Sequence, residues 1–262
     1  MTRDTILQAL GGHPWAEKLV VLDTVDSTNT YAKALAVRGA SHGTVVIADH
    51  QTGGRGRLGR QFFSPGGMGV YLSCIWRFSA PPDKLLHLTC VAAEAARRAV
   101  REASGVEASI KWTNDLVVGG KKLCGILTEL VSTPEGYAVI CGAGINCLQR
   151  PEDFPPEVAE MATSLRLLGA AADRSAVAAA LIRQLHLAGE DMVQCPQPWM
   201  QAYRSSCITL GKDVKIVRGE ETMTAHVDGM DDQGALLVTL SDGRKSVINS
   251  GEVSVRGMYG YL

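Results

Sequence analysis

The stretch GGRGRLGR, at residues 53 to 60, combines two residue types that suit a loop closing over an anion. Its glycines give the backbone conformational freedom, and its three arginines repel one another until an anion offsets their charge. The sequence therefore predicts a lid that is mobile when empty and orders over a phosphate-bearing ligand. A solvated basic hairpin is the alternative interpretation of the same residues. The residues concerned are Gly53, Gly54, Arg55, Gly56, Arg57, Gly59 and Arg60.

Two other anion-binding or nucleic-acid interpretations of this loop fail on context. The glycine spacing fits the dinucleotide fingerprint G-x-G-x-x-G, but that motif needs a helix to open at its third glycine. Here QFFSPGGMG follows, which reads as a loop and then a strand. An RGG-like nucleic-acid tail is also excluded, because the motif occurs once in a chain of net charge −1.

A second set of polar residues lies in SIKWTNDLVVGGKKLCGIL, residues 109 to 127. Lys111, Asn114 and Asp115 come near the end of a predicted strand, and Lys122 returns on the next one. A lysine on each arm of a hairpin, with an amide and a carboxylate between them, can converge on one phosphate site. Ordinary turn chemistry is the alternative. The strand ending GAGIN (142–146) has two glycines that permit close backbone approach, or simply end a strand.

The predicted strands and helices that position these residues follow from the pattern of apolar and polar residues. Strand patterns cover 18–25, 43–52, 68–78, 108–118, 121–131 and 136–147, and helical patterns cover 26–38, 83–104 and 175–192. From about residue 209 short strands separated by turn residues follow one another, which predicts a small antiparallel barrel. We expect an α+β domain over 1–208 and a small β domain over 209–262.

Composition sets further bounds on the function. The 262 residues are 46% hydrophobic and 20% charged, which is typical of a soluble globular protein. The net charge of −1 argues against general nucleic-acid or membrane binding. Seven cysteines without a C-x-x-C pair suggest neither a disulfide framework nor a zinc site, and no run of about 18 apolar residues occurs. We expect a cytoplasmic protein with no metal site of its own.

Taken together, these segments closely resemble the biotin protein ligases. The motifs that carry the resemblance are DSTN (26–29), HQTGGRGRLGR (50–60), FSPGGMGVYLS (63–73), KWTNDL (111–116), KKLCGIL (121–127), GAGIN (142–146) and GEVSVR (251–256). The resemblance implies an SH2-like catalytic domain with a mixed sheet, followed by an SH3-like barrel. It also implies formation of biotinyl-5′-AMP from biotin and ATP, and transfer of biotin to a lysine of a biotin carboxyl carrier protein.

The resemblance assigns roles to individual residues. Arg57, Lys122 and Lys111 are implied to be catalytic, facing the carboxylate and the phosphates. The implied nucleotide-binding residues are Phe62, Lys111, Asn114 and Asp115. Magnesium is expected to be held mainly by the ATP phosphates. The implied biotin and adenylate contacts are Ser27, Thr28, Asn29, Gln51, Gly54, Arg55, Gly56, Arg57, Lys122, Gly125, Gly144 and Asn146.

The chain departs from the family pattern at two positions. Phe62 replaces the usual tryptophan and keeps an aromatic wall, and Thr113 replaces the usual proline of the K-W-P-N-D motif. Two alternative functions remain, a lipoate–protein ligase and a non-catalytic biotin sensor. About 20 residues precede the first predicted strand, so we expect a short form without a DNA-binding domain and no sequence-specific DNA binding. A homodimer through an exposed sheet edge is compatible with the pattern.

Overall fold

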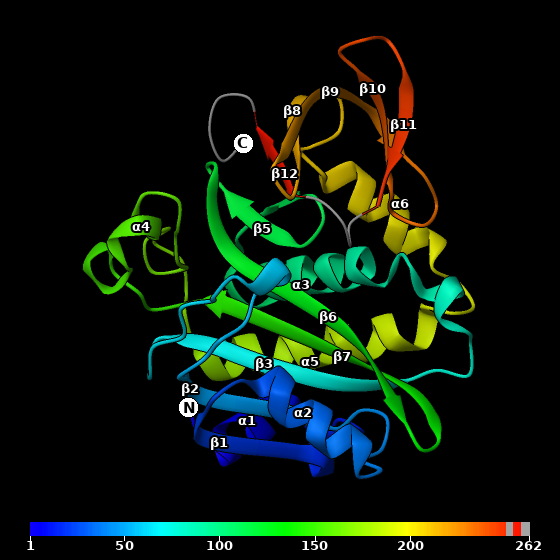
Figure 1. Ribbon diagram of the computed structural model, residues 1–262. Helices are drawn as coiled ribbons and strands as arrows, with labels where there is room; N and C mark the ends of the chain where they lie inside the picture. Colours follow the sequence, from blue (N-terminus) through cyan, green and yellow to red (C-terminus); the bar gives the residue numbers. More distant parts are fainter. Residues whose placement is uncertain (250–253, 258–262) are drawn as a thin grey trace.

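Two β-sheets organise the protein, and helices cover both faces of the larger sheet (Figure 1). The structure, a computed structural model, describes residues 1–249 and 254–257. The larger sheet has the spatial order β1-β2-β3-β7-β6-β5-β4, and within it β1 and β2 alone pair in parallel. Its strands are β1 (Leu19–Val25), β2 (Val45–Gln51), β3 (Gly69–Arg77), β4 (Ser109–Lys111), β5 (Asp115–Val118), β6 (Lys121–Thr133) and β7 (Gly136–Asn146).

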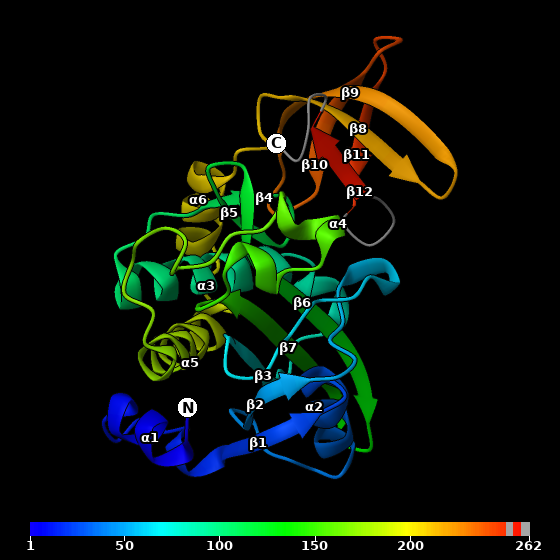
Figure 2. The ribbon, with the colours of Figure 1, turned by 90° about the vertical axis from the view of Figure 1, so that its left-hand side faces the viewer.

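The helices divide between the two faces of this sheet. Figure 2 shows α2 on one side and α1, α3 and α5 on the other, with α6 between the large sheet and the small one. The loop that follows β2 lies on the α2 side. The helices are α1 (Arg3–Leu10), α2 (Thr28–Val37), α3 (Leu88–Ser104), α4 (Pro156–Ala159), α5 (Arg174–Asp191) and α6 (Gln197–Ser206).

The sequences of β6 and β7 explain why one face is sealed and the other is open. Side chains alternate between the faces of a strand. Cys124, Ile126, Cys141, Ala143 and Ile145 join the main buried core that includes α3 and α5. The intervening positions on the α2 side include three glycines, at 125, 142 and 144. The absence of side chains there leaves room for a binding site over the middle of the sheet.

Helix α3 forms within the predicted helical range 83–104 and begins at Leu88. Ala92, Ala95, Ala96 and Ala99 are fully buried against the core, and Gly105 ends the helix with a left-handed φ of 73°. Helix α5 matches its predicted range, 175–192, within one residue at each end. The sequence did not predict α1, α4 or α6.

The segment 108–118 corrects the prediction of one continuous strand. It folds as the antiparallel pair β4 and β5, joined by a tight turn at residues 112–114, with Lys111 opposite Asp115. The Trp112–Thr113 peptide bond is cis. Helix α2 begins at Thr28, two residues inside the range 26–38 that the sequence pattern predicts. Thr28 and Asn29 therefore belong to its first turn.

The small sheet is antiparallel throughout, in the order β11-β10-β9-β8-β12. Its strands are β8 (Asp213–Arg218), β9 (Glu221–Met230), β10 (Leu236–Leu240), β11 (Lys245–Ile248) and β12 (Ser254–Gly257). These match the five predicted short strands, although residues 251–253 of the GEVSVR motif lie outside the described residues. The boundary at 208/209 stays a prediction. None of the described helices combines the length and apolar character needed to span a membrane.

Candidate active site

A niche lined by Arg55 and otherwise by uncharged residues lies at the start of α2. Thr28 donates to Gln51 Oε1 from its backbone nitrogen at 2.8 Å and from its hydroxyl at 3.0 Å. Ser73 Oγ lies 2.7 Å from Thr28 Oγ1 and 2.6 Å from Asn29 Oδ1. Ser27 occupies the N-cap position but makes no side-chain cap hydrogen bond. The side chains of Ser27, Thr28, Asn29 and Gln51 line one small space, and Ser73 orients two of them through its hydrogen bonds.

Glu129 on β6 holds two residues of the niche, Asn29 and Arg55, in place. Its carboxylate accepts from Asn29 Nδ2 at 2.8 Å and from Lys33, and lies 3.5 Å from Arg55 Nη1. Partial burial raises the pKa of Glu129, but the hydrogen bonds from Lys33 and Asn29 and the charges of Lys33 and Arg55 lower it further, so the net shift is downward. Glu129 therefore stays ionised and holds Asn29 in one orientation.

Glycines form the floor between the niche and a larger cavity. A Cβ on Gly142 would lie 2.0 Å from Asn29 Oδ1, and a Cβ on Gly144 would lie 2.4 Å from the Phe62 ring. A Cβ on Gly125 would meet both Phe62 and Lys122 at 3.1–3.3 Å. The niche encloses about 30 Å³ with Phe62 in this position. Any side chain at position 142 or 144 would therefore collide with Asn29 or with Phe62.

The larger cavity, of about 580 Å³, is strongly cationic. Among the described residues that line it, Asp115 is the one carboxylate. The cationic lining residues are Arg55, Arg57, Arg60, Lys111 and Lys122. Such a cavity attracts a polyanionic ligand, because its walls concentrate positive potential where water is partly excluded.

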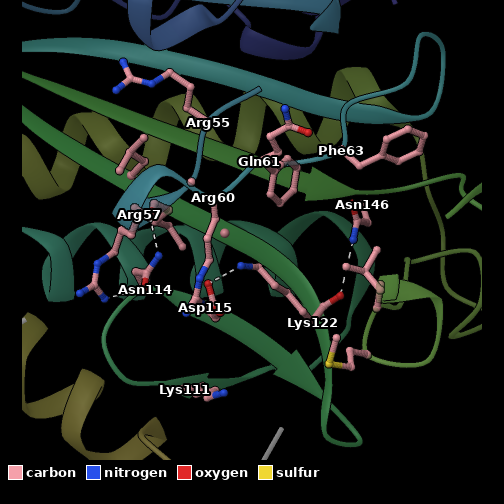
Figure 3. Close-up of a pocket in the computed structure, with 18 of the residues that line it drawn as sticks. Arg55, Arg57, Arg60, Gln61, Phe63, Lys111, Asn114, Asp115, Lys122 and Asn146 are labelled. Atoms are coloured by element: carbon pink, nitrogen blue, oxygen red, sulfur yellow. Dashed lines mark hydrogen bonds and ion pairs between the residues drawn. The ribbon is translucent and has the colours of Figure 1, made fainter. Parts of the chain in front are cut away.

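Specific contacts orient the cations (Figure 3). Arg57 Nη1 donates to Asn114 Oδ1 at 3.1 Å, and Lys122 Nζ lies 2.6 Å from Asp115 Oδ1. Asn114 in turn donates to the carbonyl of Ile126 at 2.7 Å. Figure 3 also shows Arg55 pointing away from this group. The loop arginine and the strand lysine are therefore held near the same turn, which joins β4 and β5.

Among the three arginines of the loop, Arg57 is half-buried, whereas Arg55 and Arg60 are exposed. Burial lowers the pKa of its guanidinium, and the neighbouring charge of Asp115 partly offsets that effect. The group remains charged, since the ordinary arginine pKa is far above neutral. A half-buried cation gains when an anionic ligand replaces the water that the cation has lost.

The glycine–arginine loop has the backbone of a hairpin. Phe62 N donates to Gly54 O at 2.9 Å, and Gly56 N donates to Arg60 O at 2.7 Å. Gly54 lines neither cavity; a Cβ there would lie 2.3 Å from Phe62 O. The backbone of the loop therefore agrees with the alternative of a basic hairpin. The side chain of Arg57 does not agree with it, because it is half-buried and donates to Asn114. That the loop orders on ligand binding stays a prediction.

One wall of the larger cavity was not predicted. Lys122 N donates to Met161 O at 2.7 Å, Thr163 N donates to Lys122 O at 2.9 Å, and Asn146 Nδ2 donates to Thr163 O at 3.0 Å. These bonds bring the segment 154–162 against the site. Its contribution to the lining is Phe154, Val158, Met161 and Ala162. The sequence gives no local signal for this contact, which depends on pairing across about 40 positions.

The structure brings the predicted site residues together, with Gly54 as a support behind them. Those on the niche are Ser27, Thr28, Asn29, Gln51, Arg55, Phe62, Gly125 and Gly144. Those on the larger cavity are Arg55, Gly56, Arg57, Phe62, Lys111, Asn114, Asp115, Lys122, Gly125 and Asn146. The described residues contain no cluster of three or more metal-ligating side chains.

Comparisons with known proteins agree with this geometry. The model described as the biotin/lipoate A/B protein ligase family matches residues 21–146, and the biotin protein ligase C terminal domain matches 209–256. The bifunctional ligase/repressor BirA of Bacillus subtilis (strain 168) is 35% identical over 237 residues, covering 89% of this chain and 73% of that protein. The biotin–[acetyl-CoA-carboxylase] ligase of Mycobacterium tuberculosis (strain ATCC 25618 / H37Rv) is 34% identical over 258 residues, covering 96% and 92%.

A solved structure supports the same conclusion at the level of the fold. The biotin protein ligase from Aquifex aeolicus in complex with biotin and ATP superposes with a TM-score of 0.77 at 32% identity, covering 91% of this chain and 98% of that one. The predicted fold class, a mixed α+β catalytic unit followed by a small β unit, is confirmed. The chain belongs to the biotin protein ligase family of enzymes.

Proposed function

We propose that this chain activates biotin with ATP in the cytoplasm and transfers the biotinyl group to one lysine of a biotin carboxyl carrier protein or domain. The observation that carries this proposal is the shared wall of the two cavities. The polar niche and the cationic cavity have Arg55, Phe62, Gly125 and Leu127 in common. An elongated ligand with a neutral polar head and an anionic tail, such as biotinyl-5′-AMP, fits that order of surfaces.

The niche offers what a cyclic urea needs. The ureido ring of biotin carries two N–H donors and one carbonyl acceptor, none of them charged. Thr28, Asn29 and Gln51 supply hydroxyl and amide groups that donate and accept. Because these groups already hold one another in place, little side-chain entropy is lost when a ring binds.

In the first half-reaction, a carboxylate oxygen of biotin attacks the α-phosphorus of ATP. A new P–O bond forms, the bond to the β,γ-phosphates breaks, and pyrophosphate leaves with its electron pair. Lys122 and Arg57 offset the negative charge that builds up around the α-phosphate, and Lys111 faces the departing phosphates. Preorganised charges of this kind are among the largest contributions to catalysis.

In the second half-reaction, the neutral amine of the carrier lysine attacks the acyl carbon of the adenylate. An amide bond forms, AMP leaves with the electrons of the cleaved C–O bond, and the amine loses its proton to solvent. The same cations stabilise the AMP leaving group. Before that attack, the hairpin loop excludes water from the anhydride, which would otherwise hydrolyse.

Magnesium fits this site as an ion carried by the nucleotide. The described lining provides one carboxylate, Asp115, which is paired with Lys122, and it provides Asn114 as a neutral oxygen ligand. That donor set suits a cation held mainly by phosphates and water. When bound, magnesium would neutralise phosphate charge, while Arg57, Lys111 and Lys122 orient the phosphates. The proposal does not include operator binding, given a net charge of −1.

The direct test is incubation with biotin, ATP and a purified carrier domain, followed by intact-mass and peptide analysis. We expect a mass gain of one biotinyl group on one lysine, dependent on ATP. Exchange of labelled pyrophosphate into ATP separates the alternatives. Stimulation by lipoate and not by biotin would identify a lipoate ligase, and biotin binding without exchange would identify a sensor.

A further inference from the structure

The turn between β4 and β5 is held from two sides. On its inner side, Lys111, Asn114 and Asp115 line the cationic cavity. Trp112, at the tip, also lines this cavity. Its backbone nitrogen, its indole nitrogen and the carbonyl of Thr113, however, bond to elements that lie outside the cavity. The inner side chains can keep their positions only if the tip of the turn is fixed.

Three hydrogen bonds fix the tip from the outer side. Tyr203 Oη donates to Thr113 O at 3.1 Å, Trp112 N donates to Thr209 Oγ1 at 3.0 Å, and Trp112 Nε1 donates to Gly234 O at 2.9 Å. Their partners come from α6, from the segment that follows α6, and from the turn between β9 and β10. The last of these belongs to the small C-terminal sheet.

The turn between β9 and β10 is itself rigid. Asp231 Oδ1 accepts from Gln233 N and from Ala235 N, both at 2.9 Å. Gly234 has a φ of 83°, and a Cβ there would lie 2.7 Å from Cys90 Sγ. A glycine is therefore required at this position, and its carbonyl is presented to Trp112 in one orientation.

Helix α6 connects the two supports. Arg204 donates to Asp231 O at 2.9 Å and to Asp232 Oδ1 at 2.6 Å, so it holds the β9–β10 turn. The adjacent Tyr203 is fully buried and holds Thr113. Burial also raises the pKa of Tyr203 well above its ordinary value, so its hydroxyl stays protonated and able to donate. Neither residue lines the cavity.

We propose that Tyr203 and Arg204 are positioning residues for the nucleotide half of the active site. Through Thr113 and the Gly234 carbonyl, they set the turn that carries Lys111, Asn114 and Asp115. None of the described residues of the small C-terminal sheet lines the cavity, so the sheet acts on the ATP-dependent step through the carbonyl of Gly234. This inference rests on the proposed function, because it takes the cationic cavity to be the ATP site.

The test uses Tyr203→Phe, which removes one oxygen and keeps the ring, and Arg204→Leu, which releases the β9–β10 turn. Tyr137→Phe is the matched control, since Tyr137 is half exposed near the start of β7 and lines neither cavity. For Tyr203→Phe we expect kcat/KM for ATP in biotin-dependent pyrophosphate exchange to fall about tenfold, the usual size of one lost buried hydrogen bond. Arg204→Leu should change it in the same direction.

Biotin affinity distinguishes positioning from a general loss of structure. We expect calorimetry to give a biotin Kd within about twofold of the parent for both variants, because the niche lies at the other end of the site. Equal losses for biotin and ATP, or an unchanged kcat/KM for ATP in Tyr203→Phe, would overturn the inference. Absence of biotin-dependent exchange in the parent protein would instead overturn the proposed function.

Discussion

Replacing Lys122 by Met separates the chemical role of its ammonium group from its structural role. Lys122 Nζ lies 2.6 Å from Asp115 Oδ1, and the two side chains are 28% and 16% exposed. Ion pairs near a surface stabilise a fold by about 0.2–1 kcal/mol. Methionine keeps most of the apolar stem of the lysine. We therefore expect a folded variant whose melting temperature falls by only a few degrees.

The expected effect on catalysis is larger. Two unit charges about 4 Å apart interact by about 4 kcal/mol at an effective dielectric constant of about 20. Part of that energy also binds the ground state, so only the remainder accelerates the reaction. Loss of one preorganised charge typically lowers kcat by about 10²–10³-fold. We expect biotin-dependent pyrophosphate exchange to fall by that factor in Lys122→Met.

Lys121 provides the matched control for this measurement. It is adjacent in sequence and exposed, and it does not line either cavity. Lys121→Met should therefore retain nearly the full exchange rate. The reasoning is refuted if Lys122→Met keeps more than about a tenth of the activity, or if Lys121→Met loses as much.

Three further variants or conditions probe other parts of the site and fold. Arg57→Gly should release biotinyl-5′-AMP and biotinylate exposed lysines of bystander proteins, as detected by streptavidin blotting. Gly142→Ala places a Cβ 2.0 Å from Asn29 Oδ1, so biotin affinity measured by calorimetry should fall at least about tenfold. Burial lowers the pKa values of His13 and His42. The unfolded chain therefore binds protons first, and the free energy of unfolding in urea should fall as pH drops below about 6.5.

Each of these outcomes has a control. If the Arg57→Gly variant modifies only the carrier lysine, the loop does not retain the adenylate in the way we propose. Gly229→Ala is the control for Gly142→Ala, because a Cβ at Gly229 meets nothing within 4 Å. A double variant with glutamine at His13 and His42 should flatten the pH dependence near neutrality. An unchanged slope would exclude these rings as its source.

Local signals were sufficient for elements whose own residues determine them. The helical pattern over 83–104 predicted α3, and the regularly spaced turn residues after about residue 209 predicted the short strands of the small sheet. Helix α6 was not predicted, because it is short and is stabilised mainly by the packing of its buried residues Trp199, Met200 and Tyr203. The 112–114 turn was missed for a related reason: its hydrogen-bond partners lie about 90 or more positions away.

The same distinction holds for the active site. The motif residues converge because strand ends and tight turns place them at the same part of the sheet. Ser73 and Glu129 were not singled out, although they orient Thr28 and Asn29. Their role comes from pairing between strands and helix, not from any spacing within their own segments. The wall at 154–162 also reaches the cavity only through tertiary contacts.

The most direct measurement is a crystal structure of the protein after incubation with biotin, ATP and magnesium. The account predicts biotinyl-5′-AMP with its ureido ring among Thr28, Asn29 and Gln51, and its phosphate between Arg57 and Lys122. An adenylate bound elsewhere, or one bound with both cations directed into solvent, would contradict it.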